Sequence, residues 1–273
     1  MPSRSPSSAL LAALLLTPTL GACERESAKV SNNATAPATP EEPALKLPEA
    51  VPTPAPELDR AALLAAVARA ASAHASGRQN REEQAELAGR RFTLKMRFGC
   101  GGPAGRPDAA SMGWTYDEAE QRLTVRAKPD IAADAVATGP ESPIEAVEGF
   151  WIPQPWLLTD ACPVQGAAED GAAPPAPSVG IAQFFTAEHS RVQRRSDRSY
   201  EIVRRADPAI APPSGGFNLV IEGRLAAWPD GEVIRCRGSG RAARPVCIVS
   251  AEFDRVAFEN PETGLTVAQW NAG

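Results

Sequence analysis

The segment that most limits where this chain can fold is 23–56, which contains seven prolines and almost no large apolar side chains. Most of its residues are alanine, proline, glutamate or threonine. A segment of this composition cannot bury enough surface to offset the entropy that it would lose on ordering. We therefore expect it to be an extended, disordered linker, and we expect 57–273 to form a single folded domain.

The residues before this linker have a different character. They contain one charged side chain, Arg4, and then an apolar run from Ala9 to Leu16. The run is too short to span a bilayer, which takes about 20 apolar residues. Its length and its place near the amino terminus are typical of the central region of an export signal. We therefore expect 1–22 to be a cleavable signal peptide.

The residues at the end of this signal, Leu20-Gly21-Ala22-Cys23, resemble the lipobox of bacterial lipoproteins. The resemblance covers the first 23 residues only. It implies cleavage before Cys23, diacylglycerol on the Cys23 thiol, and a membrane-anchored protein whose body faces the periplasm. In this family an Asp after the cysteine favours the inner membrane, so Glu24 at that place favours the outer membrane. The alternative is an ordinary secreted protein in which Cys23 is incidental.

Two helices are predicted at the start of the folded domain. Apolar side chains recur at intervals of three and four residues over 63–74, and Gly77 offers an end to the helix. Pro56 suits the first turn, because its backbone angle is fixed and it has no N–H to leave unpaired. A second helix is predicted to follow Asn80, with Glu83 placed to complete a capping box.

The rest of the domain is predicted to be mainly strands. Apolar and charged side chains alternate over 92–98, which predicts a strand with one buried face. The residues 186–205 are expected to be partly helical. The whole pattern predicts an α+β fold, in which an N-terminal helical segment packs on a mainly antiparallel β-sheet. Further strands are predicted at 112–116 and 123–127, which form a hairpin, and at 147–152, 179–185, 217–225, 232–237 and 246–258.

With Cys23 assigned to lipid, Cys100, Cys162, Cys236 and Cys247 remain, an even number in a compartment that permits disulfides. Four cysteines allow three pairings. Cys236 ends one predicted strand and Cys247 begins the next, so a hairpin would bring them opposite one another. Cys100 would then pair with Cys162. Free thiols are an alternative, and a four-thiolate zinc site lacks its usual paired two-residue spacings.

The sequence contains no motif of a known catalytic site. Its two histidines, His74 and His189, limit any chemistry that depends on imidazole. The serine-hydrolase elbow, the zinc-protease helix, the phosphate loop and the dinucleotide fingerprint are all missing from the sequence. We therefore identify no catalytic residue, no metal site and no cofactor. A periplasmic hydrolase that uses carboxylates or His189 remains the alternative, because Asp and Glu are abundant.

Two segments have the composition of binding surfaces. Trp151 and Trp156 lie among prolines, which is typical of rigid amphipathic surfaces for glycans or peptides, although such residues more often close a core. The arginines of 191–205 could meet an anionic polymer, but a solvated helix face explains them as well. The net charge of −5 gives no basic face for nucleic acid. We expect a lipid-anchored, noncatalytic binding or structural module whose ligand is a partner protein, peptidoglycan or another envelope component.

Overall fold

The computed structural model describes residues 55–271, except for 79, 107, 109, 133–134, 136–143, 165–175, 187–197, 206–211, 229, 239 and 241–242. The expected signal peptide, Cys23, nearly all of the expected linker and His189 lie outside the described residues. Within the described part, neither helix is long and apolar enough to cross a membrane.

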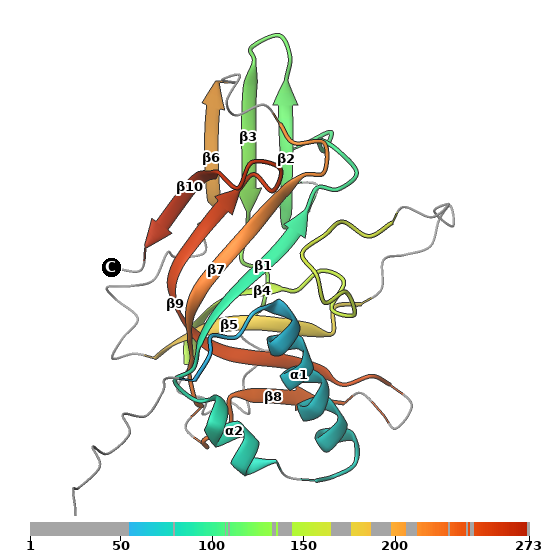
Figure 1. The fold of residues 1–273 in the computed structure, drawn as a ribbon, viewed down its shortest axis with the longest axis vertical. Coiled ribbons are helices and arrows are strands. Elements are labelled where there is room, and N and C mark those ends of the chain that lie inside the picture. The colour runs from blue at the N-terminus through green and yellow to red at the C-terminus, as the bar shows by residue number, and fades with distance from the viewer. Residues whose placement is uncertain are drawn as a thin grey trace, which may run out of the picture. The chain divides into compact units, whose positions relative to one another are not determined.

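The described chain consists mainly of β-strands together with two helices, which confirms the α+β class (Figure 1). The helices are α1 (Arg60–Ala75) and α2 (Arg81–Leu87). The strands are β1 (Arg91–Phe98), β2 (Met112–Asp117), β3 (Arg122–Ala127), β4 (Ile144–Trp151), β5 (Val179–Thr186), β6 (Tyr200–Arg205), β7 (Phe217–Leu225), β8 (Ile234–Arg237), β9 (Val246–Glu259) and β10 (Thr266–Asn271).

The helix starts differ from the prediction in detail. α1 begins after Asp59 and not at Pro56, because the Asp59 carboxylate caps the helix by accepting a hydrogen bond of 2.8 Å from the backbone N–H of Ala62. At α2 the expected capping box does not form. The side chain of Asn80 makes no cap hydrogen bond, and its backbone, at φ −118° and ψ 45°, is not extended as a capping residue usually is.

The larger sheet has the strand order β1-β7-β9-β5-β4, and β8 and β10 also pair with β9. Its strands are antiparallel to their neighbours except for β5 and β9, which are parallel. The first part of β9 pairs with β5 and β8, and its later part pairs with β7 and β10. The change of partners occurs between Ser250 and Ala251. A register shift between Glu222 and Gly223 lies further along the pairing of β7 with β9, and an added Cβ on Gly223 would lie 2.0 Å from the carbonyl oxygen of Glu252. The close approach of β7 and β9 at this point therefore requires a glycine.

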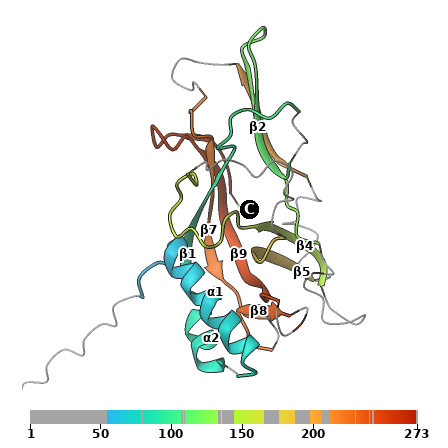
Figure 2. The ribbon, with the colours of Figure 1, turned by 90° about the vertical axis from the view of Figure 1, so that its right-hand side faces the viewer.

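The smaller sheet has the order β2-β3-β6, and all of its pairs are antiparallel (Figure 1). In Figure 2, which is turned by 90°, this sheet lies at the position of the β2 label. The predicted hairpin of β2 and β3 is confirmed. The helical expectation for 186–205 is wrong at both described ends, since Thr186 ends β5 and Tyr200–Arg205 is β6. Pairing with β3 accounts for β6, because it places Ile202 opposite the buried Val125.

Side chains from both sheets and from α1 form one buried cluster. Aromatic rings join the two sheets within it: Trp114 lies edge-on to Phe217 with ring centroids 5.8 Å apart, and Tyr200 lies edge-on to Trp270 at 5.1 Å. A second, smaller cluster contains Trp228 and residues of β5 and β9. Aromatic contacts between the two sheets are therefore part of the main core of the described residues.

Candidate functional site

An apolar surface loop follows β4 and is the strongest candidate for a functional site. We call residues 152–164 the Trp156 loop. Trp156 is 61% exposed, Leu158 54% and Val164 97%. Among the described residues, these are three of the six large apolar side chains that are exposed, so the exposed apolar surface is concentrated here.

The Arg60 side chain holds the first half of this loop through hydrogen bonds to its backbone. This side chain is only 7% exposed and donates hydrogen bonds to the carbonyl oxygens of Pro153 (2.8 Å), Gln154 (3.1 Å) and Leu157 (2.9 Å). A fourth bond, of 3.2 Å, reaches the Lys95 carbonyl at the edge of β1. Burial lowers the pKa of the guanidinium, and the negative charge of Asp160 partly offsets this. The loop backbone therefore wraps around a buried cation.

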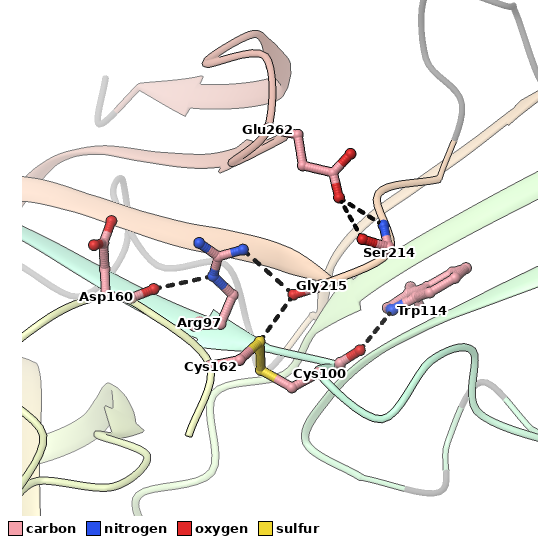
Figure 3. Close-up of a disulfide and its surroundings, with 9 residues drawn as sticks. Arg97, Cys100, Trp114, Asp160, Cys162, Ser214, Gly215 and Glu262 are labelled. Atoms are coloured by element: carbon pink, nitrogen blue, oxygen red, sulfur yellow. Dashed lines mark hydrogen bonds between the residues drawn. A yellow bond between two sulfur atoms is a disulfide. The ribbon is translucent and has the colours of Figure 1, made fainter. Parts of the chain in front are cut away.

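Arg97, on β1, holds the second half of the loop (Figure 3). Its Nε donates to the Asp160 carbonyl oxygen at 3.0 Å, and its Nη1 donates to the Gly215 carbonyl oxygen at 3.3 Å. Burial lowers the pKa of Arg97 as well, and the nearest carboxylates, beginning with Asp160, oppose that change. One side chain thus ties the loop both to β1 and to the segment that enters β7.

The disulfide between Cys100 and Cys162 closes the loop against the end of β1, with the two Cα atoms 5.8 Å apart. The Sγ of Cys162 also lies 3.1 Å from the Gly215 carbonyl oxygen. The turn before Cys100 is fixed from its other side, because the indole Nε1 of Trp114 donates to the Gly99 carbonyl at 3.2 Å (Figure 3). Gly99 has φ +70° and an added Cβ would lie 2.4 Å from the Trp114 ring, so the turn needs glycine.

A polar row on the sheet supports the loop. Arg97, Asn218 and Glu259 are register partners across β1, β7 and β9. Asn218 is 1% exposed, and its Nδ2 lies 3.3 Å from Glu259 Oε1 and 3.5 Å from Asp160 Oδ2. Lys95 pairs with Glu259 at 2.8 Å. Two carboxylates therefore converge on one buried amide, and that of Glu259 is also paired with Lys95.

Glu262, in the turn between β9 and β10, holds the segment that leads into β7. Its Oε1 accepts hydrogen bonds of 2.8 Å from both the backbone N–H and the hydroxyl of Ser214 (Figure 3). These bonds, with a smaller contribution from the charge of Arg97, lower the pKa of Glu262. The Ser214 backbone is consequently fixed next to the carbonyl that Arg97 binds.

The structure separates the two tryptophans that the sequence pointed to. Trp156 is exposed on the loop, whereas Trp151 is half-buried on β4 and packs against the smaller cluster. Gly180 is its register partner on β5, and an added Cβ there would lie 3.2 Å from the Trp151 ring. Trp151 therefore has a packing role, and only Trp156 is available to a ligand.

The other predicted site residues lie elsewhere. Cys236 and Cys247 form the second disulfide and are register partners on β8 and β9. His74 is exposed near the end of α1. In the described part of the chain, no group of three or more His, Cys, Asp or Glu side chains could hold a metal ion.

The residues that position the loop were not found from the sequence. One signal was available at Arg60, because a cation in the first turn of a helix is unfavourable with the helix dipole and needs an explanation. Arg97 and Asn218 carry no such signal. Comparison with known proteins adds no further assignment: the chain matches no protein-family model, no curated protein and no solved structure.

Proposed function

We propose that this protein is a bacterial envelope lipoprotein, anchored through lipid on Cys23 and facing the periplasm, with the outer membrane favoured. The order of charged start, apolar run, lipobox and proline-rich linker supports this proposal. The two disulfides also support it, because disulfides form and persist in exported proteins.

The body is, on this proposal, a noncatalytic binding module that uses the Trp156 loop. The observation that carries the proposal is an exposed tryptophan on a backbone that Arg60, Arg97 and the Cys100–Cys162 disulfide all hold in place. Tryptophan is enriched among residues that dominate binding energy. A backbone that is already ordered loses little entropy when its ligand binds.

We also propose that the helical segment packs on the sheet, and the contacts of Gln84 support this. Gln84 lies on α2 and is buried; its Oε1 accepts hydrogen bonds of 2.9 Å from the backbone N–H groups of Val233 and Ile234. Its Nε2 donates to the Ile234 carbonyl at 3.1 Å. The side chain thus satisfies backbone groups at the start of β8 as a neighbouring strand would.

A periplasmic hydrolase is the second candidate, and the specific observation in its favour is the convergence of Asp160 and Glu259 on Asn218. A pair of carboxylates is the usual catalytic arrangement for glycoside hydrolysis, with one acting as the general acid. The ion pair of Glu259 with Lys95 assigns Glu259 more simply to holding the loop. If this pair were catalytic, Glu259→Gln would abolish hydrolysis of a periplasmic substrate.

Site-specific photo-crosslinking in the native envelope tests the binding proposal. A photoreactive amino acid at position 156 should capture an envelope component, whereas one at position 203 should not. Val203 is 53% exposed and lies on β6 in the smaller sheet, so it controls for exposure alone. Cys23→Ala should release the protein from the membrane fraction. Equal capture from positions 156 and 203 would refute the assignment of the loop.

A further inference from the structure

We propose that the ligand of the Trp156 loop is the surface of a phospholipid bilayer, the same membrane that holds the lipid on Cys23. This inference rests on the proposed anchor and gives the body a second, direct membrane contact. The loop would insert Trp156 and Leu158 into the interfacial region, between the head groups and the start of the acyl chains.

The chemistry of the loop favours a bilayer over a glycan or a charged protein surface. Over 152–164 the only charged side chain is Asp160, which is half-buried and lies within reach of the Asn218 amide. The exposed side chains of the loop are therefore uncharged and mostly apolar: they are Trp156, Leu158, Ala161, Val164 and one polar residue, Thr159. A glycan site needs polar groups around its aromatic ring. Tryptophan is enriched at the interface of membranes, where its apolar ring and its N–H donor are both accommodated.

The place where the chain enters the body also favours the membrane. The described chain starts at Ala55, and Leu58 is bonded to the edge of β1 through its backbone N–H and the Arg91 carbonyl at 2.9 Å. Arg60, two residues later, binds the carbonyls of Pro153 and Gln154. The linker therefore joins the body through the same short segment that holds the loop.

The length of the linker makes a weak contact sufficient. A proline-rich chain as long as 23–54 extends to at most on the order of 100 Å. A body held to the bilayer by such a chain meets it at an effective concentration of about 1 mM. Two inserted side chains then suffice to keep the body docked, although they would bind vesicles only weakly without the anchor.

The rigidity of the loop also favours insertion into the interface. Shallow insertion requires the backbone to stay ordered, because carbonyl and N–H groups that lose water must keep their partners. In the Trp156 loop Arg60 binds three of these carbonyls and Arg97 binds a fourth. The loop can therefore approach the interface without leaving these groups unpaired.

The test uses the mature chain with Cys23→Ala, so that the lipid cannot account for binding. The protein is mixed with vesicles of phosphatidylethanolamine and phosphatidylglycerol at lipid concentrations from about 1 to 10 mM, and its flotation with them is measured. These concentrations match the effective concentration that the linker provides and so allow a weak contact to be detected. We expect Trp156→Ala and Leu158→Ser each to reduce the partition coefficient several-fold, and both together by at least about tenfold. Val203→Ser, at an exposure matched to that of Leu158, should leave it unchanged. Circular dichroism and thiol titration verify that each variant is folded with both disulfides.

Tryptophan emission gives a second readout. Vesicles that contain brominated lipids should quench part of the emission of the Cys23→Ala protein, and Trp156→Phe should remove that part. No flotation, equal loss in Val203→Ser, or no quenching would overturn the docking proposal. Mass spectrometry of the wild-type amino terminus tests the anchor separately, since lipid on Cys23 together with failed flotation refutes docking alone. Capture of a protein, and not phospholipid, from position 156 would also overturn it.

Discussion

Arg60 and Pro153 lie 93 residues apart in the chain and are joined by a hydrogen bond of 2.8 Å from Nη2 to the carbonyl oxygen. Through this bond and those to Gln154 and Leu157, the first residue of α1 holds the backbone of a surface loop. All of the described hydrogen bonds of the buried Arg60 side chain go to backbone carbonyl oxygens. The arrangement of these carbonyls therefore depends on a planar guanidinium with five N–H donors.

We expect Arg60→Lys to lower the free energy of unfolding by about 2–3 kcal/mol. A lysine has three donors on one nitrogen and cannot reach all four carbonyls, so some of them stay buried and unpaired. Urea denaturation measures the loss, and hydrogen exchange should show weaker protection around Leu157. The control is Arg69→Lys, which changes an exposed ion pair with Glu83 and should cost less than about 0.5 kcal/mol. Equal losses would contradict the buried-clamp interpretation.

Removing the two disulfides should have different effects on the loop. Cys100→Ser with Cys162→Ser opens a loop of 62 residues and should cost about 4 kcal/mol in the chain-entropy model. The corresponding change at Cys236 and Cys247 opens one of 11 and should cost about 3 kcal/mol.

Only the first double variant should increase proteolytic cleavage within the Trp156 loop under native conditions, because only that disulfide ends in the loop. Limited proteolysis with mass spectrometry measures this difference. Increased cleavage of the loop in both variants would show that the two bridges act through global stability.

Asp130 should make stability depend on pH. Neighbouring atoms displace water from its carboxyl and raise its pKa, while hydrogen bonds from Ser111 and the Trp151 N–H oppose this change. Because the folded-state pKa is raised, the folded protein binds more protons than the unfolded chain as the pH falls towards 4. Stability from this group therefore increases on acidification and is lost as the pH rises through the folded pKa.

Asp130→Asn keeps an acceptor for both donors and removes the charge. We expect it to stabilise the protein at pH 7 by less than about 1 kcal/mol, since solvent screens a partly exposed carboxylate. The gain over wild type should shrink as the pH falls to 4. Thermal denaturation across this range measures it, and a difference that does not change with pH would contradict the assigned cause.

Gly223→Ala should destabilise the sheet by about 3 kcal/mol, because the added Cβ meets the Glu252 backbone and neither strand can move away freely. Gly105→Ala is a suitable control: an added Cβ there has no heavy atom within 4 Å. It should change stability by less than about 0.5 kcal/mol in the same urea titration. A small effect of Gly223→Ala would mean that the register shift relaxes easily.

Local patterns in the sequence predicted most of the strands and both disulfide pairs. β7 was predicted with its full extent, because its apolar residues end at turn-forming segments on both sides. β6 was not predicted, since the arginines of 191–205, interleaved with Asp197 and Glu201, are also typical of a solvated helix face until the pairing with β3 is known. β10 was also missed. Its partner is the end of β9, and Trp270 packs on Phe258.

The candidate site could be predicted only in part. The prolines around Trp151 and Trp156 pointed to this segment as a possible binding surface, although a core role was the commoner interpretation, and they did not distinguish the half-buried Trp151 from the exposed Trp156. The supports of that residue could not be predicted, since Arg60, Arg97 and Asn218 reach the loop across 93, 63 and 58 residues of sequence. Contacts over such separations leave no periodic pattern in the sequence.

β9 has a consequence for how the larger sheet comes apart. This one strand of 14 residues hydrogen-bonds to β5 and β8 in its first part and to β7 and β10 in its later part. Both parts of the sheet share β9 as their central strand. Neither part can therefore separate from the other and remain a complete sheet. The amide protons of β9 should therefore exchange only when the whole sheet opens, as one cooperative unit.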